Sequence, residues 1–281
     1  MAKPGETGGG NDEHDIRRQS HNMFPFFQTP FISPWWSAAA VAALLPASMG
    51  LLSAMRRRDM LAAEPARKLL HVEMGLVTLS FPWLIGQTDV VLVLALLATA
   101  WFIGVRRCAA LRAIFGGVLD GVGRHSWGEV YFTVGACLTF LLAAGNTLRY
   151  CLPMAILVFA DTAAALAAPR DPARRHSIGI NGKSVEGCAA FVAVALVCAI
   201  VALSLRPEES LARTLSVALL LAFDTTVMEV LGSHGADNLL IPVGAAFLLP
   251  ELLHAGQPAL LAHLGAVVAL MVLWCQMRQW P

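Results

Sequence analysis

Residues 150–168 read YCLPMAILVFADTAAALAA and residues 187–205 read GCAAFVAVALVCAIVALSL, and the segment PRDPARRHSIGINGKSVE joins them. At about 1.5 Å of helix rise per residue, each apolar run is nearly long enough to cross a hydrocarbon core of about 30 Å. The pair therefore predicts two membrane helices joined by a polar loop. The one acid in these runs, Asp161, lies seven residues before the end of the first, which is about 10 Å inside its helix.

The composition of the whole chain is typical of a polytopic membrane protein. Of its 281 residues, 57% are hydrophobic and 14% are charged, whereas soluble domains contain about 25% charged residues. The mean hydropathy of +0.64 agrees with this class. The net charge of +1 provides no general attraction to nucleic acid, so we expect no nucleic-acid partner.

We expect an all-α, polytopic integral membrane helix bundle with about nine transmembrane helices. The nine candidate spans are residues 36–54, 69–86, 89–105, 128–145, 150–168, 187–205, 214–232, 239–254 and 258–277. The eighth span is short, and a re-entrant hairpin is the alternative for the last two. Residues 1–33 are expected to form a flexible segment with an aromatic end that binds the membrane interface, and residues 34–281 a single transmembrane domain.

The distribution of lysine and arginine predicts the orientation of these spans. With the first loop in the cytoplasm, 14 of the 20 lysine and arginine residues lie on the cytoplasmic side. Cytoplasmic loops of membrane proteins carry such an excess. The sequence therefore predicts an N-terminus outside and a C-terminus inside the cell.

Four polar clusters interrupt the apolar pattern, and this topology places all of them at the cytoplasmic face. They are residues 67–75, 124–129, 161–187 and 229–238. Four predicted helices begin there, and a helix N-terminus attracts anions through its free N–H groups and its dipole. Ser184 or Asn181 is expected to cap one of these helices, and Asp237 or Asn238 another. Together, acids, cations and helix starts are what a nucleotide phosphate and its metal ion require.

Several of these residues also have a purely structural interpretation. Lys68 can share a helix face with His71, but it can equally extend its charge to the membrane surface. Asp161, Glu229 and Asp237 favour a metal-binding or ion-pairing role, because acids at membrane depth are costly unless they are paired, solvated or metal-bound.

The motifs in these clusters resemble those of a known family. Asp161-x-x-Ala164, the basic loop and Lys183-Ser184-x-Glu186-Gly187 resemble the CTP-binding signature of the polyprenol kinases, which include dolichol kinase and phytol kinase and are related to phosphatidate cytidylyltransferases. The resemblance covers roughly residues 60–250. Three further elements are similar to the family in order and spacing: Arg67-Lys68-x-x-His71, Ser126-x-Gly128-Glu129, and Glu229 followed by Asp237-Asn238.

The loop after Asp161 departs from the family pattern. Ala168 and Pro172 stand where the family usually has glycine, and Arg174 stands where it has lysine. Glycine lets a backbone approach phosphate closely, so the path of this loop is expected to differ. Arg174 or Arg175 would replace the charge of the missing lysine but not its geometry.

The resemblance implies an enzyme that transfers a phosphoryl group from CTP, with Mg²⁺, to the hydroxyl of a long-chain isoprenoid alcohol or other lipid. It implies a site on the cytoplasmic face of a bacterial inner (plasma) membrane, among membrane lipids, with residues 34–281 as the catalytic domain. The implied catalytic residues are His71, Asp161, Lys183 and Glu186. The implied nucleotide-binding residues are Arg67, Lys68, Arg174, Arg175, Lys183, Ser184, Gly187 and Asn238, and the implied Mg²⁺ ligands are Asp161, Glu229 and Asp237. Either His71 or Asp161 would take the proton of the alcohol.

Two other functions remain as alternatives. The fragment from Ser233 to Asp237 is similar to the end of the phosphatidate cytidylyltransferase signature, although the Lys-Arg and Lys-Asp elements of that signature are absent. A transporter is the second alternative, with Asp161, Asp224 and Glu229 along an ion path. Many transporters contain repeated halves, and the sequence shows no convincing internal repeat.

Overall fold

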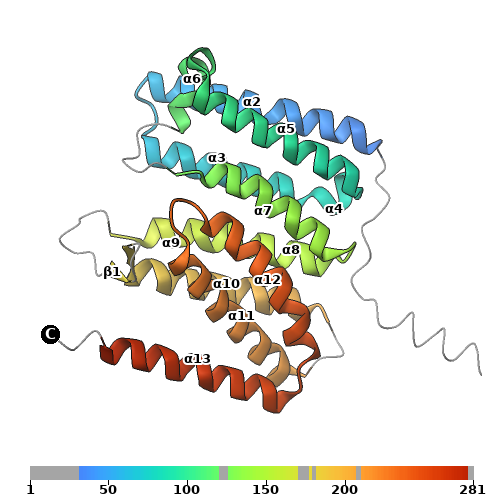
Figure 1. Cartoon of the computed structure of the whole chain (residues 1–281), viewed down its shortest axis with the longest axis vertical. Helices are drawn as coiled ribbons and strands as arrows, with labels where there is room; N and C mark the ends of the chain where they lie inside the picture. Colours follow the sequence, from blue (N-terminus) through green and yellow to red (C-terminus); the bar gives the residue numbers. More distant parts are fainter. Residues whose placement is uncertain (1–31, 120–125, 170–176, 179–181, 207–209, 278–281) are drawn as a thin grey trace, which may run out of the picture.

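The computed structural model describes residues 32–119, 126–169, 177–178, 182–206 and 210–277, and its account of side chains ends at Leu270. Within these ranges the chain is almost entirely helical (Figure 1). The exception is a pair of two-residue antiparallel strands, β1 (Ser177–Ile178) and β2 (Lys183–Ser184). The expected all-α class is therefore confirmed, with a minimal hairpin in the loop that precedes α10.

The helices follow one another with short connections. In the first half they are α2 (Pro34–Arg57), α3 (Ala63–Leu79), α4 (Phe81–Leu84), α5 (Thr88–Arg107), α6 (Ala109–Phe115), the 3₁₀ turn η1 (Gly116–Val118) and α7 (Gly128–Ala143). In the second half they are α8 (Thr147–Ala155), η2 (Ile156–Ala160), α9 (Asp161–Ala167), α10 (Val185–Ser204), α11 (Leu211–Leu231), α12 (Asp237–His254) and α13 (Gln257–Met277).

The segments α8, η2 and α9 follow one another without a break and form one continuous helical rod. This rod positions Asp161 next to α3. The central segment η2 is a π-helix, and it follows Pro153 inside α8. Proline cannot donate a backbone hydrogen bond and crowds the preceding turn, so regular α-helical bonding is interrupted there. Such widened turns are frequent at functional sites, and Asp161 is the first residue beyond this one.

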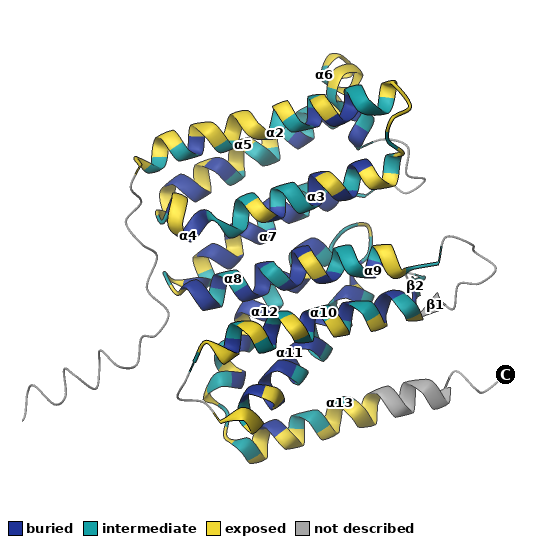
Figure 2. Cartoon of the chain, turned by 180° about the vertical axis from the view of Figure 1, so that it is seen from behind, coloured by how far each residue is buried: buried dark blue, intermediate teal, exposed yellow. Residues whose placement is uncertain are grey.

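The helices lie side by side, with α2 and α5 at one edge of the molecule and α13 at the opposite edge (Figure 1). Between these edges, α7 packs against α5 and α12, and α11 packs against α10, α12 and α13. Large apolar side chains face outward, including Trp36 at 74%, Leu96 at 70% and Leu166 at 70% exposure. Figure 2 shows this exposed surface on the outer helices, with buried positions between them. An outer surface of this kind is suited to lipid contact.

Close packing between α3 and η2 sets the position of the site. A Cβ atom on Gly75 would lie 2.2 Å from Cγ2 of Val158, so only glycine permits this approach. Nearby, the hydroxyl of the fully buried Tyr150 donates to the carbonyl oxygen of Thr78 at 2.9 Å. These contacts hold the polar face of α3 against the rod that carries Asp161.

Each of the nine expected spans coincides with helix, but the count of nine membrane crossings stays a prediction. Within the described residues, five helical segments are long and apolar enough to cross a membrane: 34–57, 88–107, 147–167, 185–204 and 211–231. The expected span 69–86 begins earlier, at Ala63, so Lys68 and His71 lie in the second turn and beyond rather than at a helix start. The short helix α6 was not expected from the sequence.

Candidate functional site

The first part of the candidate site is a buried cluster between α3 and α9. Lys68 Nζ donates to Asp161 Oδ2 at 2.7 Å, and His71 Nε2 lies 3.6 Å from the same oxygen. Lys68 and His71 are three residues apart on α3, which places them on one helix face. Lys68 is 9% and His71 8% exposed. The costly burial of Asp161 is thus offset by an opposite charge, as the sequence predicts for an acid at this depth.

The second part brings together β2, the C-terminal end of α11 and the start of α12. Lys183 Nζ lies 2.6 Å from Glu229 Oε1 and 2.8 Å from Asp237 Oδ2. Glu229 is almost completely buried, at 2% exposure. Burial opposes the charge on Lys183, but the carboxylates of Asp237 and Glu229 outweigh it and raise the pKa of the lysine above its ordinary value. Lys183 therefore stays a cation at any physiological pH.

The two clusters act on each other through their charges. The carboxylate of Asp161 adds to the electrostatic field that favours the charged form of Lys183. Together the clusters contain three carboxylates against the two ammonium groups of Lys68 and Lys183. The site thus has hard oxygen donors and an excess of negative charge, which suits a divalent cation.

A third group of contacts joins α7 to the loop before α12. Asn238 Nδ2 donates to the carbonyl oxygen of Gly128 at 3.0 Å, and Ser126 Oγ donates to the carbonyl oxygen of His234 at 3.1 Å. Gly235 has a φ of 92°, and a Cβ atom there would lie 2.5 Å from the Cα atom of Gly128. These contacts bring the Ser126-x-Gly128-Glu129 element next to Asp237-Asn238, although 108 residues separate Ser126 from His234.

The start of α10 confirms one of the expected caps. Ser184 Oγ accepts a hydrogen bond from the backbone N–H of Gly187 at 3.0 Å. Gly187 also packs closely on α9, because a Cβ atom there would lie 3.0 Å from the carbonyl oxygen of Ala164. Glu186 lies in the first turn and is partly buried. The nucleotide-binding role of Ser184 and Gly187, and the catalytic role of Glu186, stay predictions.

The expected cap of α12 is wrong. Asp237 is the first residue of the helix, Ala236 takes the cap position, and no side chain caps this end. Instead, Asp237 Oδ2 accepts a hydrogen bond from Lys183 Nζ. Asp237 Oδ1 accepts a second hydrogen bond, from the backbone N–H of Asn238 at 3.1 Å. Hydrogen bonds between charged groups are stronger than neutral ones, so the attraction of the Lys183 ammonium group explains this choice.

Other predicted residues lie at the edge of the site or beyond the described chain. Arg67 pairs with Glu64 on its own helix at 2.7 Å, although its charge also interacts with Asp161. Arg174 and Arg175 lie outside the described residues.

In the part of the chain that the structure describes, no group of three His, Cys, Asp or Glu residues is placed to hold a metal ion alone. Magnesium commonly uses one or two protein carboxylates together with substrate phosphates, so the acids of the site still fit that ion.

Sequence reasoning missed two contributors. Arg106 contacts Glu129 Oε2 at 2.7 Å and covers the Trp127 ring, with 5.2 Å between its guanidinium carbon and the ring centroid. Phe132 meets the His71 ring edge-on, with 5.4 Å between their centroids. In the sequence, Arg106 is one of several arginines near helix ends and nothing marks it as a partner of Glu129. No sequence pattern distinguishes Phe132 from other apolar residues of its helix.

Comparisons with known proteins agree with the motif resemblance. No family model matches the chain, and no solved structure matches it significantly. A protein named phytol kinase from Synechocystis sp. is 26% identical over 222 residues, which cover 78% of this chain and 93% of that protein. The matched region is long enough to include most of the helix bundle. The similarity relates this chain to the polyprenol kinase family, as its motifs predict.

Proposed function

We propose that this protein transfers the γ-phosphoryl group of CTP to the hydroxyl of a long-chain isoprenoid alcohol. The observation that carries the proposal is the network of ion pairs that brings together residues from four helices and a hairpin: Lys68, Asp161, Lys183, Glu229 and Asp237. These residues belong to the motifs shared with polyprenol kinases. The similarity to a phytol kinase over most of both chains supports the same reaction class.

Positioning and charge neutralisation are the main requirements of phosphoryl transfer. Lys183 and Lys68 would bind the phosphate oxygens. Lys183 is partly exposed and lies just before the start of α10, and Lys68 lies on α3 next to Asp161. Asp237, Glu229 and Asp161 would hold Mg²⁺, which when bound would neutralise charge on the phosphates. The ion pairs among these residues would keep both lysines and all three acids oriented for these partners.

The surroundings of His71 support it, rather than Asp161, as the group that takes the proton. Asp161 already accepts a hydrogen bond from Lys68. The His71 ring is held by a hydrogen bond to the backbone of Leu157, whereas Nε2 has no hydrogen-bond partner among the described residues. A ring that donates from Nδ1 to a carbonyl oxygen leaves a lone pair on Nε2. The alcohol proton would pass to that nitrogen as the alcohol oxygen bonds to phosphorus and CDP leaves, and Asp161 would stabilise the resulting cation.

The site is proposed to face the cytoplasm of a bacterial inner membrane. The site residues of α3, α7, α9, α10 and α12 meet at one end of the bundle. That end also has the arginine-rich termini of α2 and α5. Positive charge on cytoplasmic loops and the cytoplasmic supply of nucleotide both favour this orientation, which places the N-terminus outside.

Product analysis tests the proposed reaction. Purified protein is incubated with Mg²⁺, CTP or ATP, and a panel of lipid alcohols and phosphatidate, and products are identified by mass. The kinase makes CDP and a lipid phosphate, whereas a cytidylyltransferase makes pyrophosphate and a CDP-lipid. Lys183→Ala and Asp161→Ala should abolish turnover while the protein still inserts into the membrane. Normal turnover in both variants would overturn the proposal.

A further inference from the structure

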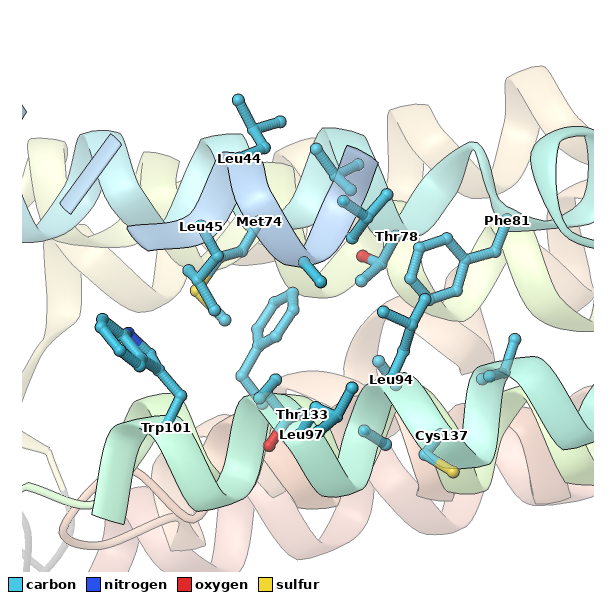
Figure 3. Close-up of a pocket in the computed structure, with 18 of the residues that line it drawn as sticks. Leu44, Leu45, Met74, Thr78, Phe81, Leu94, Leu97, Trp101, Thr133 and Cys137 are labelled. Carbon is cyan, nitrogen blue, oxygen red and sulfur yellow. The ribbon is translucent and has the colours of Figure 1, made fainter. Parts of the chain in front are cut away.

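A cavity of about 300 Å³ lies between α2, α3, α5 and α7, next to the polar clusters. Its lining is almost entirely apolar, with Leu45 and Met74 on one side and Leu94 and Trp101 on the other (Figure 3). The volume is at the lower end of the range of about 300–1,000 Å³ that ligand pockets occupy. None of the ion-paired site residues lines this cavity.

The cavity is elongated along the helices. Its lining on α5 extends from Val91 to Trp101, which is about 15 Å at the rise of an α-helix. Figure 3 shows Trp101 at one end, and Phe81 and Cys137 toward the other. This shape fits an extended chain better than a compact head group.

The lining contains one charged residue, Glu73, which is hydrogen-bonded to Ser48. The threonines of the lining also have protein partners. Thr78 donates to the carbonyl oxygen of Gly75 at 3.0 Å. Thr133 donates to the carbonyl oxygen of Val130 and lies 2.9 Å from the hydroxyl of Thr99. Because these groups are satisfied, the walls select for an apolar occupant.

One aromatic ring separates this cavity from the reacting groups. Phe132 lines the cavity and also meets His71, with 5.4 Å between ring centroids. On the other side of His71, the Asp161 carboxylate is 3.6 Å away. A chain that fills the cavity and carries a hydroxyl at its inner end would present that hydroxyl at the polar site.

We infer that this cavity binds the apolar tail of the isoprenoid alcohol, with Phe132 at the passage to His71 and the Phe81 end limiting tail length. This inference rests on the proposed function, because it assigns a place to the acceptor of that reaction. The tail is the favoured occupant over a bilayer lipid chain because the cavity adjoins His71, the group proposed to deprotonate the acceptor.

Two alanines of α5 provide a matched test of the cavity. Ala98 lines it, whereas Ala100 is exposed on the outer surface of the same helix. Ala98→Phe should raise KM for a long isoprenoid alcohol about tenfold or more, since pocket contacts of this size discriminate by about 10–200-fold. KM for a short prenyl alcohol and for CTP should stay within about twofold, which also shows that the variant folds. Ala100→Phe should leave all of these values unchanged, and equal KM values for the long alcohol in both variants would overturn the inference.

A binding experiment separates this inference from the kinase reaction itself. An isoprenoid alcohol with a diazirine at its tail end is photo-crosslinked to the protein in liposomes without nucleotide, and labelled peptides are mapped by mass spectrometry. We expect labelling of lining residues of α3, α5 and α7, competition by unlabelled alcohol, and loss of the label in Ala98→Phe. If such labelling occurs but no donor supports phosphorylation, the proposed reaction fails while the cavity assignment stands. Labelling confined to outer faces, or equal labelling by a diazirine phosphatidylcholine that the alcohol does not displace, would overturn the assignment.

Discussion

Two adjoining faces of α3 have surroundings that differ in chemistry and in packing. The face with Lys68, His71 and Gly75 lies so close to η2 and α9 that the glycine has no room for a Cβ atom. The adjoining face, with Met74 and Thr78, borders a cavity of about 300 Å³. Groups that take part in phosphoryl transfer need fixed positions, whereas an apolar tail needs only volume and an apolar lining. A single helix therefore meets both requirements of the proposed reaction.

The largest expected effect comes from separating Lys68 and Asp161 on the close-packed face. Lys68→Met and Asp161→Asn should each lower kcat by about 10³-fold, because each removes a positioned charge near the phosphoryl group. The double variant should lose little more than either single one, since groups that act as a unit are not additive. Steady-state kinetics of the three variants measure this coupling. Multiplicative losses would mean that the ion pair does not act as a unit.

A smaller loss is expected at His71. His71→Gln should lower kcat by about 10²-fold, the lower end of the usual contribution of a general base. KM for CTP should stay within about twofold, because the ring contacts Asp161 and Phe132 rather than the proposed nucleotide ligands. Steady-state kinetics with CTP and alcohol varied separately provide the measurement. An unchanged kcat would reassign proton removal to Asp161.

Gly75 tests whether close packing itself is required on this face. Gly75→Ala should lower the free energy of unfolding by about 1–3 kcal/mol, the usual cost of overpacking, because the new Cβ atom would lie 2.2 Å from Val158 Cγ2. Val158→Ala removes that methyl group, so the double variant should recover part of the loss. Thermal unfolding in detergent measures both. No difference between the single and double variants would show that α3 and η2 pack in another way.

The smallest effect is expected on the cavity face. Met74→Ala, one turn after His71, should leave kcat within about twofold and raise KM for a long alcohol by about 3–30-fold, as expected for lost apolar contacts. KM for CTP should not change. The comparison with His71→Gln is direct, because the two residues are one turn apart on the same helix, with His71 against Asp161 and Met74 in the cavity lining. A fall in kcat as large as that of His71→Gln would show that the two faces are not functionally separate.

Much of the fold was predictable because membrane helices are encoded locally. A run such as residues 187–205 contains enough apolar side chains to identify a helix without knowledge of its neighbours. Helix boundaries were less accurate, as at α3, because the polar first turn around Ala63 has no apolar signal. The motif residues Lys68, His71, Asp161, Lys183, Glu229 and Asp237 were also identified from the sequence, since ionisable groups are rare and costly at membrane depth.

Sequence alone established a helical membrane protein with its unusual charges gathered in four clusters. Only the tertiary structure decided that Lys68 pairs with Asp161 across 93 residues of sequence, that Lys183 joins Asp237 across 54, and that Arg106 supports Glu129. Only it revealed an apolar cavity behind His71. The physical reason is that hydrophobicity is a property of each segment, whereas ion pairs and cavities depend on which faces of distant helices meet and how closely they pack.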